Sequence, residues 1–181
     1  MTQSKDTGIS LSLEDGDFKI LLLIRHAKSS WDAAVLSDFD RPLNERGKKD
    51  APVMAARLKD KKIGIDAFVS SPAKRAKKTA EIFCEIYKAS ENSIHYIPAL
   101  YHAPCSTFFN VVCSLDDGFK NVAIFSHNPG ITEFANTLSD AVEIDNMPTC
   151  SICGIKVFTG NWANFREAKK EFLLFDYPKN I

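Results

Sequence analysis

The feature that most constrains this chain is a series of short apolar runs. In the run Ile20–Ile24 (ILLLI) every residue is apolar, with no polar residue at alternate positions. A strand without such alternation is typical of one that is buried on both faces of a sheet. Six segments are predicted to be strands, and several share this pattern: Phe18–Ile24, Ile65–Ser70, Ser93–Ile97, Asn121–Ser126, Cys150–Phe158 and Glu171–Asp176.

Between these strands, apolar residues recur at helical spacing. A helix is expected at 44–60, where Asn44 is suited to cap the N-terminus. Pro52 is expected to break this helix or restart it near Asp50, because proline lacks a backbone N–H. The predicted apolar stripe of the helix consists of Ala51, Met54, Ala55 and Leu58.

A second helix is expected after the strand that ends at Ser70. Ser71 is the predicted N-cap and Pro72 the first helical residue. Its apolar stripe consists of Ala76, Thr79, Ile82, Phe83 and Ile86. Two further helices are expected at Pro104–Leu115 and Pro129–Leu138, each with a proline near its start.

Strands that alternate with helices predict a three-layer α/β/α sandwich around a mainly parallel, mixed central sheet. The chain has 181 residues, of which 45% are hydrophobic, and this suits one domain with a full core. We expect that domain over 18–181, because no repeat or low-complexity linker divides it. Residues 1–17 are polar, acidic and glycine-bearing, and are expected to form a flexible N-terminal arm.

The charge balance disfavours two classes of partner. Lys+Arg and Asp+Glu number 23 each, so no overall field attracts nucleic acid or an anionic membrane. The longest apolar run falls far short of the roughly 20 residues needed to cross a bilayer, and the first seventeen residues do not resemble a signal peptide. We therefore expect a cytoplasmic protein that binds neither nucleic acid nor membrane.

The five cysteines are an odd number, and only Cys150 and Cys153 have the spacing of a metal or redox pair. A zinc site needs a second pair of ligands, and none stands nearby. A redox pair usually opens a helix, whereas TCSICGIKVF has the composition of a strand. We therefore expect small buried thiols in a sheet and no metal.

Three of the predicted strands end in side chains that bind anions. The first ends at Arg25 and His26, the second leads into a helix that carries Arg75, and the fourth ends at His127 and Asn128. The carboxyl ends of parallel strands meet at one edge of a sheet, so these side chains are expected to converge. Arginine forks and helix N-termini both bind phosphate. The pattern therefore predicts a site for a phosphoryl group.

The same segments resemble the motifs of the histidine phosphatase (phosphoglycerate mutase-like) superfamily. LLLIRHAKSSW is similar to its Arg-His-Gly signature, with Ala27 in place of glycine, and LNERGKKDA, SSPAKRAKKTA and FSHNPG resemble its later motifs in the same order. Within the superfamily, RHAKSSW, DFDRPLNERG, SHNPGITEFAN and NMPTC most resemble the SixA-like phosphohistidine phosphatases. The four superfamily motifs span Lys19 to Ile131, which is most of the chain.

The resemblance implies a phosphatase with four catalytic residues: His26, Arg25, Arg75 and His127. His26 would be the nucleophile, which attacks phosphorus in line and forms a phosphohistidine intermediate that water hydrolyses. The other three would stabilise charge on the equatorial oxygens of the phosphoryl group. Because cationic side chains take the role of a metal ion, no metal or other cofactor is expected.

Five further residues are expected to bind substrate: Ser29, Lys28, Arg41, Asn128 and His102. Ser29 matches a family position that contacts phosphate, and a role in a turn is its alternative. Arg41 is expected at the rim of the site, with an ion pair to Asp38 or Asp40 as its alternative. Lys28 is expected to supply positive potential rather than chemistry.

One side chain that many members of the superfamily use in catalysis, a carboxylate, is missing from this sequence. Many members that hydrolyse phosphate esters carry a carboxylate after the third strand, where this chain reads IPALYHAPCS without Asp or Glu. General acid catalysis is typically worth about 10²–10⁴-fold, and a phosphoramidate needs it less, because its nitrogen accepts a proton from solvent or substrate. A protein phosphohistidine, or another activated phosphate, is therefore the expected substrate. His102 is the only nearby candidate acid, and the fifth-strand region or a loop is the alternative source of a distant one.

Two other functions remain open at this point. The first is a phosphatase of small phosphate monoesters with the same fold, which would use His102 or a substrate proton as acid. The second is a phosphoprotein-binding module without turnover, which the intact His26 and both arginines argue against. The expected partner is a phosphohistidine-bearing protein or a small phosphorylated substrate.

Overall fold

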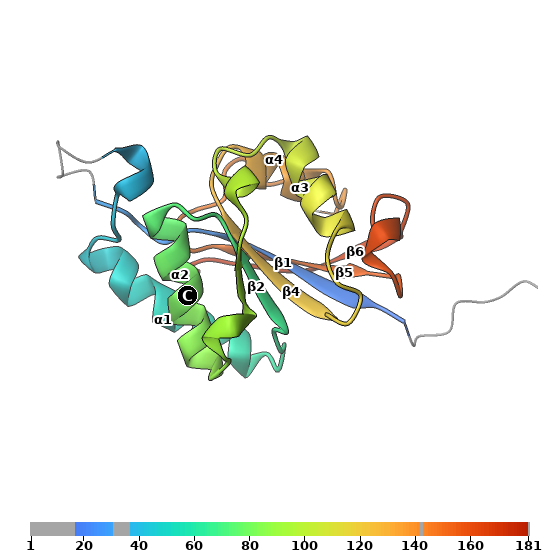
Figure 1. The fold of residues 1–181 in the computed structure, drawn as a ribbon, viewed down its shortest axis with the longest axis horizontal. Coiled ribbons are helices and arrows are strands. Elements are labelled where there is room, and N and C mark those ends of the chain that lie inside the picture. Colours follow the sequence, from blue (N-terminus) through green and yellow to red (C-terminus); the bar gives the residue numbers. More distant parts are fainter. Residues whose placement is uncertain (1–16, 31–36, 142, 181) are drawn as a thin grey trace, which may run out of the picture.

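A mixed six-stranded sheet runs through the middle of the molecule (Figure 1). The computed structural model describes residues 17–30, 37–141 and 143–180. Its strands are β1 (Lys19–Arg25), β2 (Ala67–Ser70), β3 (Ile94–Tyr96), β4 (Asn121–Ser126), β5 (Ile152–Val157) and β6 (Lys170–Asp176). They lie in the order β3-β2-β4-β1-β5-β6. The pairs β3–β2, β2–β4 and β4–β1 are parallel, whereas β5 is antiparallel to both β1 and β6.

Helices cover both faces of this sheet (Figure 1). The α-helices of the described residues are α1 (Glu45–Asp60), α2 (Lys74–Tyr87), α3 (Cys105–Cys113) and α4 (Gly130–Asn136). Four short 3₁₀-helices lie between them and the strands: η1 (Asp38–Asp40), η2 (Glu91–Ser93), η3 (Pro98–Leu100) and η4 (Trp162–Asn164). Helices α1 and α2 pack on one face, and α3 and α4 pack on the other.

Strand β1 contributes to the core on both faces of the sheet. Leu21 and Leu23 join the cluster beneath α3 and α4, whereas Leu22 and Ile24 join the cluster beneath α1 and α2. All four side chains are fully buried. Side chains alternate between the two faces of a strand, so a strand covered by helices on both sides needs apolar residues at every position. This confirms the predicted three-layer sandwich.

Each of the six predicted strands overlaps one observed strand, and the cap of the first helix is also confirmed. The Oδ1 of Asn44 accepts a hydrogen bond of 2.9 Å from the N–H of Gly47. The predicted break at Pro52 is wrong, because α1 runs without interruption from Glu45 to Asp60. A proline removes one helical hydrogen bond, and the buried stripe on both sides of Pro52 outweighs that loss: Ala51, Met54, Ala55 and Leu58.

The predicted start of the second helix is also wrong. Helix α2 begins at Lys74, with Ala73 as its N-cap and no side-chain cap hydrogen bond. Ser71 lies in the preceding turn, where its Oγ accepts a hydrogen bond of 3.3 Å from the N–H of Ala73 and contacts His127. The two remaining helices, α3 and α4, each begin one residue after the predicted proline.

The cysteines are free thiols, and the spaced pair is buried. Cys150 lies in the cluster beneath α1 and α2, and Cys153 lies in the cluster on the opposite face of the sheet. Burial raises the pKa of Cys153 to about 12, so its thiol stays protonated at neutral pH. Both thiols are buried as predicted, but only Cys153 lies in the sheet, because Cys150 is in the turn before β5.

The predicted N-terminal arm, 1–17, lies outside the described residues except for Asp17. Among the helices of the described ranges, none is both long and apolar enough to cross a bilayer.

Two glycines allow the loops of the site to pack closely. A Cβ atom on Gly47 would overlap the backbone carbonyl of Lys28, and one on Gly130 would overlap that of Ala103. Only glycine permits so close an approach. The first contact seats α1 against the segment that follows β1, and the second seats α4 against the segment that follows η3. These two segments carry much of the candidate site.

Candidate active site

The candidate site lies at the carboxyl ends of β1, β2 and β4. Strands β1 and β4 are parallel, and Arg25 is in register with Ser126. The N–H of His26 donates a hydrogen bond of 3.0 Å to the carbonyl of Ser126, so His26 and His127 emerge side by side. Strand β2 lies next to β4 and leads through Ser71 to α2. The three strand ends therefore meet, as the sequence predicts.

His26 is buried, with 7% of its surface exposed. Its Nδ1 donates a hydrogen bond of 2.8 Å to the carbonyl of Ala27, and its Nε2 accepts one of 3.2 Å from Nε of Arg75. Burial is the main reason that the pKa of His26 lies well below its usual value. The nearby His127 also lowers it, the bond to Ala27 raises it, and the charges of Arg75 and Arg25 lower it further. The ring is therefore neutral, with the lone pair on Nε2.

His127 lies beside His26, and the centres of the two rings are 5.0 Å apart. Its Nε2 is hydrogen-bonded to Oγ of Ser71 at 2.8 Å. Its Nδ1 is buried without a hydrogen-bond partner among the described residues. Burial, followed by the nearby Arg75, lowers the pKa of His127 to about 3. His127 is therefore neutral in the free protein.

The two arginines expected in the site, Arg25 and Arg75, are held by contacts with different segments of the protein. Nη1 of Arg25 donates a hydrogen bond of 2.5 Å to the carbonyl of Met147, and its buried Nε has no hydrogen-bond partner among the described residues. Arg75 lies in the first turn of α2 and is 4% exposed. Thr79 fixes this part of α2, because its hydroxyl donates to the carbonyl of Arg75 (2.7 Å) and accepts from the N–H of Ala27 (3.0 Å).

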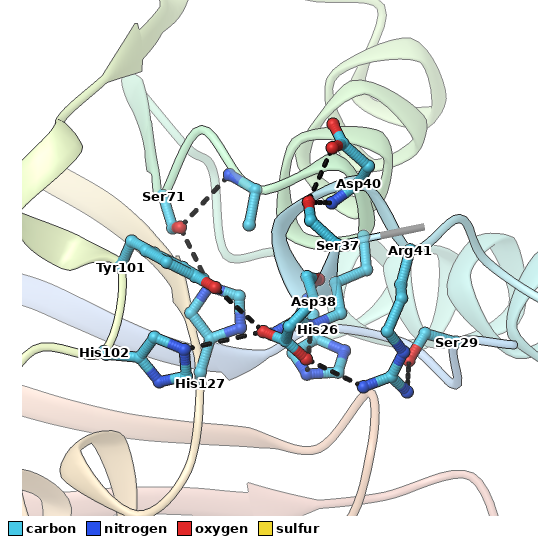
Figure 2. Close-up of polar contacts among 12 residues, drawn as sticks. His26, Ser29, Ser37, Asp38, Asp40, Arg41, Ser71, Tyr101, His102 and His127 are labelled. Carbon is cyan, nitrogen blue, oxygen red and sulfur yellow. Dashed lines mark hydrogen bonds and ion pairs between the residues drawn. The ribbon is translucent and has the colours of Figure 1, made fainter. Parts of the chain in front are cut away.

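The carboxylate of Asp38, in η1, lies at the centre of a hydrogen-bonded cluster (Figure 2). Its Oδ2 accepts hydrogen bonds from Nη2 of Arg75 (2.9 Å) and from the hydroxyl of Tyr101 (3.0 Å). Its Oδ1 accepts one from Nη1 of Arg41 (2.9 Å), and its backbone carbonyl accepts one from Nη1 of Arg75. Burial alone would raise the pKa of Asp38, but these hydrogen bonds outweigh it and hold that pKa well below its usual value.

The segment after η3 forms one wall of the site. The rings of Tyr101 and His102 lie 4.1 Å apart, and Nε2 of His102 is 3.5 Å from Oδ2 of Asp38. Phe39 meets Tyr101 edge to face at 5.1 Å. Ser126 fixes this segment, because its hydroxyl donates a hydrogen bond of 2.9 Å to the carbonyl of Leu100. The wall is therefore aromatic, with the carboxylate of Asp38 at its edge.

The remaining predicted residues contact other parts of the protein. Nη2 of Arg41 donates a hydrogen bond of 2.7 Å to Oγ of Ser29, so Arg41 joins Ser29 to Asp38, and the alternative of an ion pair with Asp38 is present. The side-chain amide of Asn128 bonds to Asn146, Met147 and Thr132. The backbone carbonyl of Lys28 accepts a hydrogen bond from the N–H of Asn44.

Three residues of this cluster do not follow from the sequence. Asp38 is expected only as one possible partner of Arg41, and Ser71 only as a helix cap. Tyr101 carries no local signal at all, because its place depends on how the segment after η3 packs over β4.

Within the described ranges, no group of three or more His, Cys, Asp or Glu side chains is arranged to hold a metal ion.

Comparison with known proteins agrees with this geometry. The chain is 29% identical over 150 residues to the uncharacterized chloroplastic protein At3g52155 of Arabidopsis thaliana, which covers 78% of this chain and 68% of that one. Phosphohistidine phosphatase SixA of Escherichia coli is 31% identical over 113 residues, or 60% and 67% of the two chains. The structure of the protein histidine phosphatase SixA complexed with tungstate has the same fold, with a TM-score of 0.74 at 24% identity over 89% and 98% of the chains. Residues 21–100 match the family model of the histidine phosphatase superfamily (branch 1), and the chain belongs to this superfamily.

Proposed function

We propose that this protein is a phosphatase that hydrolyses protein phosphohistidine in the cytoplasm through a phosphoryl intermediate on His26. The observation that carries the proposal is the state of Nε2 of His26. It is an unprotonated nitrogen that lies 3.2 Å from a guanidinium, at a point where three strand ends meet.

The environment of His26 supports the role of nucleophile. A histidine attacks phosphorus only as a neutral ring, and burial keeps its pKa low. The bond from Nδ1 to the carbonyl of Ala27 holds the proton on the far nitrogen. Nε2 is therefore the unprotonated nitrogen, and its electron pair accepts the hydrogen bond from Arg75, which an incoming phosphorus atom would replace.

The cationic groups around His26 support the binding of a phosphoryl group. Arg25 and Arg75 supply fixed positive charge, and this charge is most of what phosphoryl transfer requires. Nε of Arg25 and Nδ1 of His127 are buried nitrogens without a partner in the described structure. Buried polar atoms are normally satisfied, and the oxygens of a bound phosphoryl group would provide acceptors.

The proposed reaction has two steps. Nε2 of His26 attacks phosphorus, and the bond between phosphorus and the leaving group breaks as the new P–N bond forms. Water then attacks the phosphoryl group on His26 and releases inorganic phosphate and the free histidine. Arg25, Arg75 and His127 bind the equatorial oxygens in both steps, and His127 gains a proton only when the dianion is present.

The choice of phosphohistidine rests on the state of the nearest carboxylate. Asp38 borders the site, but its low pKa keeps it ionised, so it has no proton to give to a departing alkoxide. His102 is the candidate acid that the sequence suggests, and its side chain is 59% exposed. A phosphoramidate needs such an acid less than an ester does, which favours phosphohistidine over alkyl monoesters.

A substrate panel tests this proposal. We expect release of phosphate from a phosphohistidine-bearing protein, little from sugar and nucleotide monoesters, and none from either with the His26→Asn variant. The matched control is His95→Asn, a histidine on the exposed edge strand β3, which should keep full activity. Strong turnover of monoesters alone would favour a small-molecule phosphatase. Tight binding of tungstate without any turnover would favour a phosphoprotein-binding module.

A further inference from the structure

The leaving group of phosphohistidine has a chemical requirement of its own. When the P–N bond breaks, its electron pair goes to a ring nitrogen of an imidazole. The ring leaves as a neutral molecule if its other nitrogen carries a proton, and as an unstable anion if it does not. A site for phosphohistidine therefore needs an acceptor that keeps a proton on the far nitrogen of the departing ring.

His26 already shows how the protein meets this requirement for its own imidazole. The carbonyl of Ala27 accepts the hydrogen bond from Nδ1 at 2.8 Å, so Nδ1 keeps its proton while phosphorus is bound to Nε2. In the second step His26 is itself the leaving group, and it leaves as a neutral ring. Transfer from one imidazole to another needs the same arrangement on the substrate side.

Asp38 provides an acceptor on that side. Arg75 lies between the two groups, because its Nε contacts Nε2 of His26 and its Nη2 contacts Oδ2 of Asp38 at 2.9 Å. The carboxylate is thus separated from the nucleophile by the width of the guanidinium that would bind the phosphoryl group. Its side chain is 40% exposed, so a ring that enters from solvent can reach it.

His102 shows that an imidazole fits there. Its Nε2 lies 3.5 Å from Oδ2 of Asp38, and its ring lies 4.1 Å from that of Tyr101 and 6.3 Å from that of His127. The side chain of His102 is 59% exposed, so a rotation into solvent would vacate this place at little cost. An incoming ring would then have the ring of Tyr101 on one side and the carboxylate of Asp38 at its edge.

We propose that Asp38 and Tyr101 bind the departing imidazole of phosphohistidine in the place that His102 takes here, with Asp38 accepting the hydrogen bond from the ring nitrogen that is not bound to phosphorus. The inference rests on the proposed function and deepens it. The P–N bond of the substrate breaks, the bond from phosphorus to Nε2 of His26 forms, and the electron pair goes to the leaving nitrogen. The proton stays on the far nitrogen throughout, and Asp38 remains a carboxylate.

This arrangement selects the leaving group. An ionised carboxylate stabilises a ring that bears a proton, and it cannot protonate an alkoxide. The same Asp38 that assists an imidazole therefore gives an alkyl phosphate no help. Tyr101 adds a contact to the departing ring, because its own ring lies 4.1 Å from that of His102.

The test compares two substrates whose leaving groups differ. Phosphoimidazole needs a proton on its far nitrogen, whereas para-nitrophenyl phosphate leaves as a stable phenolate. Asp38→Asn should lower kcat/KM for both, since Arg75 loses an ionic partner, but the loss for phosphoimidazole should be about 10²-fold and at least tenfold greater than the loss for para-nitrophenyl phosphate. Asp38→Glu, which keeps the carboxylate, should recover part of the difference.

The matched control is Asp40→Asn, in the same turn of η1. Asp40 accepts its hydrogen bond from the hydroxyl of Ser37 at 2.6 Å, so this variant should keep the activity of the wild type on both substrates. If Asp38→Asn lowers both activities by the same factor, Asp38 only holds Arg75 in place and the inference is wrong, while the proposed function stands. If the wild type hydrolyses para-nitrophenyl phosphate but neither phosphoimidazole nor phosphohistidine, the proposed function fails, and the inference fails with it.

Discussion

The Nε of Arg75 lies 3.2 Å from Nε2 of His26 and donates a hydrogen bond to the nitrogen that we propose as the nucleophile. This contact has two consequences. It requires that Nε2 carry no proton, and it places the guanidinium that would hold the phosphoryl group next to that nitrogen. The same guanidinium pairs with Asp38, so Arg75 connects the nucleophile to the residue that we propose binds the leaving group.

Replacement of Arg75 by lysine should impair both functions of this guanidinium. One ammonium group cannot contact His26 and Asp38 as the planar fork does. We expect Arg75→Lys to lower kcat/KM by at least about 10²-fold and to weaken the binding of tungstate. Lys74→Ala, which removes an exposed charge one residue earlier, should have little effect. An Arg75→Lys variant with the kcat/KM of the wild type would show that the fork is not needed.

The burial of His127 makes stability depend on pH. Its pKa of about 3 in the folded protein lies below the usual value of about 6.5. As the pH falls below about 6.5, His127 becomes protonated in the unfolded chain but stays neutral in the folded protein. The free energy of unfolding therefore decreases until about pH 3. Between pH 7 and pH 5, the wild type should therefore lose about 2 kcal/mol more than His127→Asn.

Urea unfolding of both proteins at the two pH values measures this difference. Equal losses in the wild type and the variant would mean that His127 is not kept neutral by burial.

The contact between Gly47 and the backbone of Lys28 can be tested in the same way. A Cβ atom at position 47 would overlap the carbonyl of Lys28, so α1 or the segment after β1 must move. We expect Gly47→Ala to lower the free energy of unfolding by about 1–3 kcal/mol and to reduce kcat, because that segment begins with His26.

Gly64→Ala is the matched control for this variant. The nearest atom to a Cβ there is Nδ2 of Asn121 at 3.7 Å, which is an ordinary contact distance. Stability and kcat should both remain close to those of the wild type. If the two variants have equal stability, the close approach of α1 is not required.

Much of the fold and part of the site can be predicted from sequence. The apolar run Ile20–Ile24 in β1 predicts helices on both faces of the sheet. The parallel arrangement of β1, β2 and β4 predicts that Arg25, His26 and His127 converge at the strand ends. Both follow from patterns that are local in the chain. The catalytic roles of these residues stay predictions, which the substrate panel and the variants test.

What sequence could not predict depends on contacts between distant segments. Pro52 does not interrupt α1, because the buried stripe on both sides outweighs one lost hydrogen bond. Ser71 does not cap α2, which begins three residues later, and its hydroxyl also bonds to His127, 56 residues away. Asp38 and Tyr101 meet across 63 residues, and no local pattern in either segment indicates the other.

The mass of the protein during a single turnover shows whether His26 carries the phosphoryl group. We expect rapid quenching after mixing with a phosphohistidine-bearing protein to show an added mass of one phosphoryl group, mapped to the peptide that contains His26. The His26→Asn variant should show no such addition and no release of phosphate. A phosphoryl group on another residue, or phosphate release by His26→Asn at the rate of the wild type, would show that His26 is not the nucleophile.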